Sequence, residues 1–137
     1  MDLIAQLKEE HVQIVRLFEE TESYASGKNP NGSNLNSSMN EWKEVLIQHL
    51  KLEDEALYPK FKNSESEECK NLGEKFSEEM STISKAALVF FDKYNSTESS
   101  DLINNEEFVN ELAEIINVIK KRVEVEETIL FPAFGKC

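Results

Sequence analysis

Hydrophobic side chains recur along the chain at spacings of three and four residues, in four separate stretches. The positions between them are mostly charged or polar, so each stretch carries one apolar stripe. This pattern is typical of an amphipathic helix that turns one face to a core. The stripe positions are Ile4, Leu7, His11, Ile14 and Phe18; Trp42, Val45, His49, Leu52 and Ala56; Phe76, Met80, Ile83, Ala87 and Phe90; and Phe108, Leu112, Ile115, Ile119, Arg122, Glu126 and Ile129.

Three polar segments separate the four stretches. Residues 26–32 contain two glycines and a proline and interrupt any helix, whereas residues 62–67 and 95–101 are weaker, serine-rich joints. The first connection is the longest, and we expect a mobile loop over residues 25–38. The remaining connections are short, so consecutive helices should run antiparallel.

Local signals mark the expected ends of the helices. Proline removes a backbone hydrogen bond and clashes with the preceding turn, so Pro59 and Pro132 predict an end or a kink in the second and fourth helices. Serine and aspartate side chains cap helix N-termini. The candidate caps are Ser64 or Ser66 for the third helix and Ser100 or Asp101 for the fourth.

Four helices of roughly 20 to 27 residues joined by short loops predict an all-α fold, an antiparallel up-down-up-down four-helix bundle. The chain has 137 residues, the size of one common domain, and we expect a single domain over residues 1–137. It contains only 4 glycines and 3 prolines, too few for a barrel or sandwich with many turns.

The chain also resembles itself. Three of eight positions are identical between residues 7–14 and 76–83, and four of fourteen between residues 48–61 and 121–134. The second pair of segments shares a Pro-x-Phe ending, which favours two helical hairpins built on one pattern. The polar or unusual positions that fall opposite each other are His11 and Met80, His49 and Arg122, and Glu53 and Glu126.

The charge balance excludes several kinds of partner. With 15 basic and 27 acidic residues, the net charge of −12 disfavours binding to nucleic acid or to anionic membranes. No stretch reaches the roughly 20 apolar residues of a membrane span, and the charged N-terminal region does not read as a signal peptide. We therefore expect a soluble, cytoplasmic protein.

Two cysteines are too few for a disulfide framework. We expect Cys69 to lie on the outer side of the third helix and Cys137 to lie in a mobile chain end.

Polar residues on the apolar stripes are the candidates for chemistry. His11, His49, Arg122 and Glu126 lie in line with core positions, and Glu53 follows His49 by one helical turn. Residues at positions i and i+4 share a helix face, so His49 and Glu53 can present two ligands to one point. Helical bundles build metal sites from inward-facing histidines and carboxylates. Two imidazoles and a carboxylate with open positions suit non-haem Fe(II).

These residues stand in a specific order. The motifs are Glu10-His11-x-x-Ile14; His49-x-x-x-Glu53 leading into Leu57-Tyr58-Pro59; and Glu126-Glu127-x-x-Leu130-Phe131-Pro132. Together they resemble the hemerythrin-like (HHE cation-binding) family over nearly the whole chain. The resemblance implies a four-helix bundle around a non-haem di-iron centre, in a family of oxygen carriers, sensors and iron-sulfur repair proteins. By motif match it implies His11, His49, Glu53 and Glu126 as metal ligands.

Two departures from the family pattern fall in one hairpin. Met80 stands where the pattern implies a histidine on the third helix, and Arg122 stands where it implies one on the fourth. A thioether is a poor ligand for iron in this setting, and a protonated guanidinium is no ligand at all. Arg122 would also repel a second divalent ion. We therefore expect neither a di-iron centre nor reversible O2 carriage by one.

Two interpretations of the core remain open. In the first, one iron binds at His11, His49 and Glu53, with Glu126 bridging or in the outer shell, and Arg122 pairs with Glu126 and with Glu53. A sensing or regulatory protein that takes a small diatomic ligand such as O2 or NO would follow. In the second, the bundle is a metal-free interaction module whose carboxylates Arg122 neutralises alone. A buried carboxylate needs a cation in either case.

Other sites have weaker support from the sequence. A distorted dinuclear site could use Glu79 or Asp54, a haem could take axial ligands from His11, His49 or Met80, and the same three could hold copper(I). The simplest role of Met80 is to fill the core. No catalytic triad, thiol-histidine pair or phosphate loop is present, so an enzyme is not the favoured prediction.

Overall fold

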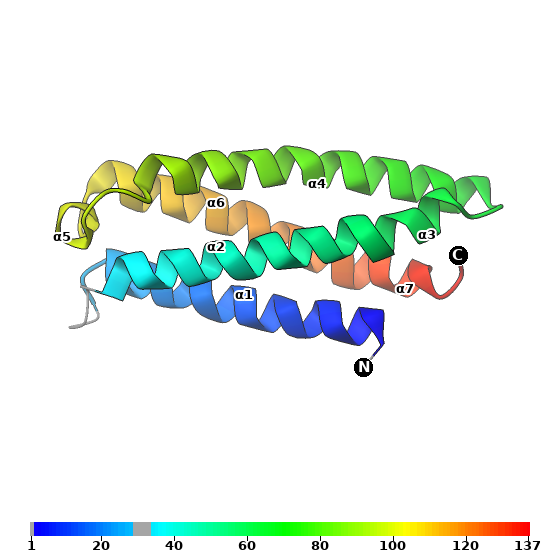
Figure 1. Cartoon of the computed structure of the whole chain (residues 1–137), viewed down its shortest axis with the longest axis horizontal. Helices are drawn as coiled ribbons and strands as arrows, with labels where there is room; N and C mark the ends of the chain where they lie inside the picture. Colours follow the sequence, from blue (N-terminus) through cyan, green and yellow to red (C-terminus); the bar gives the residue numbers. More distant parts are fainter. Residues whose placement is uncertain (1, 29–33) are drawn as a thin grey trace.

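Four long helices lie side by side and alternate in direction (Figure 1). The computed structural model describes residues 2–28 and 34–137, and all regular structure in these ranges is helical. This arrangement confirms the predicted antiparallel bundle. The long helices are α1 (Leu3–Ala25), α2 (Leu35–Leu52), α4 (Glu67–Tyr94) and α6 (Glu106–Val125).

Two of the long helices continue through a short π-helical segment into a further α-helical turn. Helix α2 passes into η2 (Glu53–Leu57) and α3 (Tyr58–Lys62), while α6 passes into η3 (Glu126–Leu130) and α7 (Phe131–Phe134). Each turn after a π-helix carries a proline at its second position, and a proline cannot donate the usual helical hydrogen bond. A wider π-helical turn therefore precedes each of the two prolines at which the sequence predicts an end or a kink.

Helix caps follow the sequence in one case and depart from it in another. The Ser66 side chain accepts a hydrogen bond from the backbone of Cys69 and caps α4, as predicted. Asn105, rather than Ser100 or Asp101, caps α6 by accepting from Phe108 at 3.0 Å. Those two expected caps lie instead in a separate short helix, α5 (Ser99–Leu102). Helix α5 ends because Ile103 is extended, and Asn104, with a φ of 61°, then turns the chain toward α6.

The first connection is shorter than the predicted loop over residues 25–38, because α2 already begins at Leu35. Leu35 is fully buried, so its packing fixes the start of that helix inside the expected loop. The predicted mobility concerns residues 29–33, which lie outside the described residues.

The core consists of two apolar clusters along the bundle. One cluster packs around Phe18, Trp42 and Phe91, and the other packs around Leu57 and Phe61 near the opposite end. On every long helix the stripe passes from one cluster to the other. The polar stripe residues fall at this passage, so the site lies inside the bundle between two dry layers.

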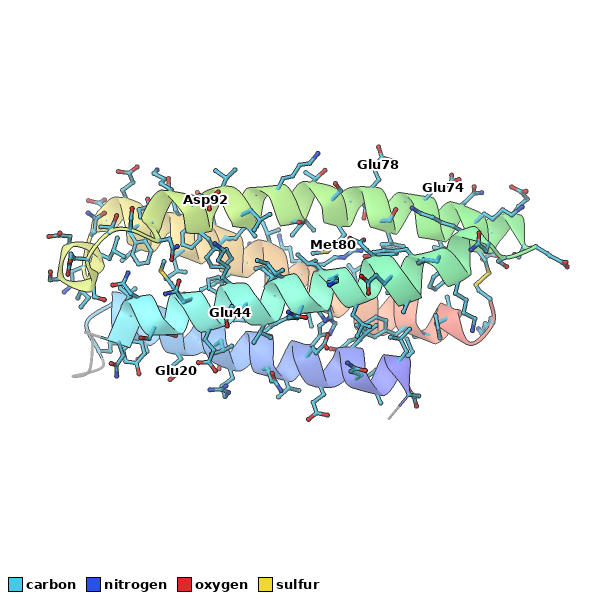
Figure 2. All side chains as sticks on the ribbon, in the orientation of Figure 1. Glu20, Glu44, Glu74, Glu78, Met80 and Asp92 are labelled. Atoms are coloured by element: carbon cyan, nitrogen blue, oxygen red, sulfur yellow. A yellow bond between two sulfur atoms is a disulfide. The ribbon has the colours of Figure 1, made fainter. Side chains whose placement is uncertain are left out.

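A disulfide joins Cys69 at the start of α4 to Cys137 at the chain end (Figure 2). The expectations of an outward-facing Cys69 and a mobile Cys137 are therefore wrong. Cys69 is buried because the stripe of the third helix extends backward from Phe76 through Gly73 to Cys69, at helical spacing.

Among the described residues, no helix is long and apolar enough to cross a membrane.

Candidate metal centre

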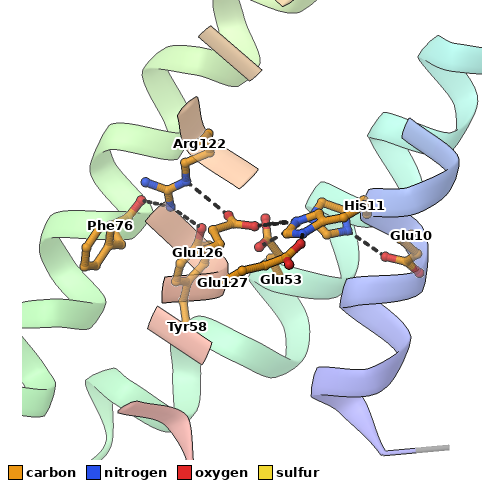
Figure 3. A network of polar contacts seen from close by, with 9 residues as sticks. Glu10, His11, Glu53, Tyr58, Phe76, Arg122, Glu126 and Glu127 are labelled. Carbon is orange, nitrogen blue, oxygen red and sulfur yellow. Dashed lines mark hydrogen bonds and ion pairs between the residues drawn. The ribbon is translucent and has the colours of Figure 1, made fainter. Parts of the chain in front are cut away.

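Four buried polar side chains converge between the two apolar clusters (Figure 3). His11 comes from α1 and His49 from α2, while Glu53 and Glu126 are the first residues of η2 and η3. Their exposed fractions are 2% for His11, 3% for His49, 0% for Glu53 and 1% for Glu126. The structure thus brings together all four residues that the sequence singled out.

Three of these side chains form a group that could hold a metal ion. Candidate ligand atoms of His11, His49 and Glu126 all lie within 4.8 Å of one another. The Oε1 atom of Glu126 lies 2.8 Å from His11 Nε2 and 3.6 Å from His49 Nε2. Both imidazoles therefore turn the same nitrogen toward a shared carboxylate that the opposite hairpin supplies.

The other nitrogen of each histidine is held by a second carboxylate. His11 Nδ1–H donates to Glu127 at 2.7 Å, and His49 Nδ1–H donates to Glu10 at 2.7 Å. With a metal bound, these bonds would keep the ring proton on Nδ1 and leave the inner Nε2 atom as the ligand. Phe131 stacks on the His11 ring with centroids 5.4 Å apart and adds a steric constraint to its orientation.

Glu10 and Glu127 are functional candidates that the sequence analysis quoted in motifs without giving them a role. Each lies next to a predicted ligand in the chain, yet each bonds a histidine on a different helix. Adjacent residues on a helix point about 100° apart, so a carboxylate beside a ligand can reach a neighbouring helix. That geometry is the signal that could have identified them.

Glu53 is the least satisfied residue of the site. It forms an ion pair with His49, whose Nε2 lies 3.5 Å from Glu53 Oε2. Neither carboxylate oxygen has a hydrogen-bond partner among the described residues. Burial, followed by repulsion from Glu126, raises the pKa of Glu53 to about 8. A cation bound here would compensate the buried carboxylate, so this residue fits a metal site.

The pKa of His49 shifts through competing influences. Burial lowers it, but hydrogen bonds with Glu10, Glu126 and Glu53 outweigh burial and raise the pKa well above its ordinary value. In Glu126, burial raises the pKa, and its bonds with His11 and His49 reverse this and lower it strongly. Without a metal, the centre therefore holds protons on His49 and Glu53 that a bound cation must displace.

Arg122 occupies the opposite side of Glu126. Its Nε donates to Glu126 Oε2 at 3.1 Å, and its Nη2 donates to both the Tyr58 hydroxyl and the Phe76 carbonyl at 2.9 Å (Figure 3). The predicted pairing with Glu126 is confirmed. The predicted pairing with Glu53 is absent from the described contacts, because the outer guanidinium nitrogens turn to Tyr58, Phe76 and Glu79 instead.

The position opposite His11 in the repeat is filled by an apolar side chain. Met80 is 6% exposed and packs in the cluster of Leu57 and Phe61, as expected of a core residue. Glu79, one of the two acids considered for a dinuclear site, lies 3.5 Å from Arg122 in an ion pair. A guanidinium and a thioether therefore close the second half of the centre.

A small internal cavity adjoins these side chains. Its volume is about 10 Å³, roughly enough for one water molecule or one ion. His11, His49, Glu126, Arg122 and Met80 line it together with apolar residues. In this packing the cavity is far too small for the haem that the sequence left open.

Comparison with protein families gives an independent result. A family model described as Hemerythrin HHE cation binding domain matches residues 2–134. Searches of curated proteins and of solved structures each found no match to the chain. The matched range covers every element that supplies a residue to the centre.

Proposed function

The chain belongs to the hemerythrin HHE cation-binding domain family, and from this premise we propose that it binds one non-haem iron and acts in sensing or regulation. The proposed ligands are His11, His49, Glu53 and Glu126. The observation that carries the proposal is Glu53, whose two buried oxygens have no hydrogen-bond partner among the described residues, beside the group of His11, His49 and Glu126. A cation is the simplest compensation for this arrangement.

The choice of one metal rests on Arg122. Its guanidinium is bound to Glu126, Tyr58 and the Phe76 carbonyl and holds a fixed positive charge beside the carboxylate. A second divalent ion would meet that charge and would find no imidazole on its side. Reversible O2 carriage by a pair of irons is therefore not part of the proposal.

The choice of iron rests on the chemistry of the ligands. Imidazole nitrogens and carboxylate oxygens suit Fe(II), and a bound iron would supply a redox-active centre for a small diatomic ligand such as O2 or NO. The protein's own residues prepare this chemistry. Glu10 and Glu127 hold the imidazoles in one tautomer, and the two apolar clusters exclude bulk water from both sides.

Metal analysis tests the proposal. We expect about one iron per chain by mass spectrometry in untagged protein loaded anaerobically with Fe(II). His49→Ala should lose the iron, whereas the matched neighbour variant Gln48→Ala should keep it, because Gln48 lies on the exposed side of α2. Near-zero iron in folded wild-type protein, or equal iron in both variants, would contradict the proposal.

A metal-free interaction module is the second candidate, and one observation favours it. Glu126 is already satisfied within the protein by Arg122 on one oxygen and by His11 on the other. In that case His49→Ala would leave both the fold and partner binding intact, and function would lie on the surface. Iron content separates the two candidates directly.

The cytoplasmic location belongs to the same proposal. The Cys69–Cys137 disulfide is the opposing observation, because stable disulfides are rare in reducing compartments. Alkylation of the protein in freshly lysed cells, followed by mass spectrometry, measures how much of the pair is oxidised. A fully oxidised pair would contradict a reducing location.

A further inference from the structure

A surface cleft leads toward the buried centre between α2 and α4. Its volume is about 240 Å³, and it extends from Leu50 and Asp54 on one side to Ser77 and Ser84 on the other. Tyr58 and Met80 also line it. Figure 2 labels Met80 on α4, where its side chain lies between the helices.

Met80 also lines the small cavity that holds His11, His49 and Glu126. Among the described residues, no other side chain lines both spaces. Met80 is therefore the side chain at which the cleft and the cavity meet.

The two side chains at the base of the cleft differ in freedom. The Tyr58 hydroxyl is held by Arg122 at 2.9 Å, and that arginine is itself anchored on Glu126. Met80 has no hydrogen bond in the described contacts and an unbranched side chain with three rotatable bonds. A change of its rotamer would connect the cleft and the cavity without breaking a polar contact.

A second cleft offers no comparable path. It lies between α1 and α2, with Glu10, Gln13 and Val45 in its lining, and shares no residue with the internal cavity. The Glu10 carboxylate there bonds His49 Nδ1, so a ligand would have to pass the imidazole ring. The two clefts therefore make a matched pair for an experiment.

We propose that the cleft at Met80 is the access route by which a small uncharged molecule reaches the centre, and that Met80 is its gate. This inference rests on the proposed function, because the molecule that passes the gate is a ligand of the proposed metal site. The size class follows from the cavity of about 10 Å³. The lack of charge follows from Met80, the side chain that the cleft and the cavity share, because its thioether offers a hydrated ion little compensation for lost water at that point.

The first test needs no metal. Both native cysteines are in the disulfide, so Met80→Cys introduces a single free thiol. Methyl methanethiosulfonate should label it at least about tenfold faster than the thiol of Met39→Cys, which is 1% exposed and requires local opening of the core. Equal labelling rates in the two folded variants would overturn the inference, whether or not iron binds.

The second test uses nitric oxide as the probe on protein whose iron content has been measured. Ser84→Trp should slow formation of the iron–nitrosyl absorption band, while Gln13→Trp in the other cleft should leave it unchanged. Met80→Ile, which is stiff at χ1, should slow it by up to about tenfold, and Met80→Ala should accelerate it. Equal rates in the two tryptophan variants would overturn the route.

The tests separate this inference from the proposed function. Fast labelling of Met80→Cys in protein that binds no iron would contradict the proposed function and support the cleft as a path into the cavity. Bound iron together with slow labelling would support the metal site and contradict the gate.

Discussion

The two hairpins of the bundle place similar residues at equivalent points and use them differently. In the first hairpin, Glu10 of α1 holds His49 of α2 at 2.7 Å. At the equivalent positions of the second hairpin, Glu79 of α4 pairs with Arg122 of α6 at 3.5 Å. The backbone preserves the repeat as well, because both π-helices begin at an equivalent glutamate. One half presents two imidazoles, and the other presents a permanent cation.

The difference shows how one repeated helical pattern can carry different polar groups at equivalent positions of the same fold. Glu126 lies between the halves, with one oxygen on His11 and the other on Arg122. Its charge is compensated on the second side by a residue of the chain. On the first side, neither oxygen of Glu53 has a hydrogen-bond partner among the described residues, although His49 lies 3.5 Å away in an ion pair. The following predictions test this difference between the two sides.

The largest effect should come from removing the built-in cation. Arg122→Ala leaves Glu126, Tyr58 and the Phe76 carbonyl without their donor, and we expect a loss of ~3–5 kcal/mol in the free energy of unfolding. Chemical denaturation measures it. The control Arg16→Ala removes an exposed pair with Glu20 and should cost less than about 1 kcal/mol. Equal costs would contradict the role of Arg122.

The disulfide fixes the C-terminal end of the second hairpin, and removing it should cause the second-largest loss of stability. Cys137→Ser opens a disulfide that joins residues 68 apart in sequence, which should lower the free energy of unfolding by about 2–4 kcal/mol. Wild-type protein in reductant should lose the same amount. A variant as stable as the oxidised wild type would show that the disulfide contributes nothing.

The metal-free protein should lose stability as the pH rises from about 5 to 8. Folding raises the pKa of Glu53 from 4.5 to about 8, so the folded state keeps a proton that the unfolded state has released across that window. The pKa of His49 is also raised on folding, above its ordinary value of 6.5, so His49 likewise lowers stability as the pH rises above 6.5. We expect a loss of roughly 3 kcal/mol in the free energy of unfolding, measured by urea denaturation of chelator-treated protein. Glu53→Gln should flatten the dependence of the free energy of unfolding on pH. A wild-type stability that rises with pH in this window would contradict the prediction.

The outer carboxylates should show the smallest effect and the clearest contrast between hairpins. Glu10→Gln weakens the acceptor that orients His49, and iron affinity should fall by roughly 10–100-fold in a competition titration with a chelator. Glu79→Gln, the equivalent change in the second hairpin, should leave iron affinity within about threefold, because the polar contact of Glu79 among the described residues is with Arg122 and not with a histidine. Similar losses of iron affinity in both variants would contradict the proposed difference between the two hairpins.

The fold and the inner site residues follow from short-range patterns in the sequence. The spacing of apolar residues predicts the four long helices, and polar residues on those stripes predict His11, His49, Glu53 and Glu126 as the inner group. Their convergence follows because all four lie where the stripes pass between the two core clusters.

Contacts between helices could not be predicted from the sequence, because they depend on how each helix is rotated about its own axis. Glu10 and Glu127 lie off the stripes, and their bonds to histidines on other helices depend on packing angles. The pairing of Cys69 with Cys137 depends on where the last turn after the π-helix ends. The predicted caps at Ser100 and Asp101 are wrong for α6, because α5 occupies that part of the serine-rich connection and α6 begins later, at Glu106.

The central claim is that Met80 and Arg122 stand in place of a second metal site within an otherwise intact repeat. The most direct test is the iron content of Met80→His/Arg122→His beside wild type, both loaded anaerobically and measured by mass spectrometry. The account predicts about one iron per chain in wild type and about two in the double variant. Equal iron content in the two folded proteins would contradict it.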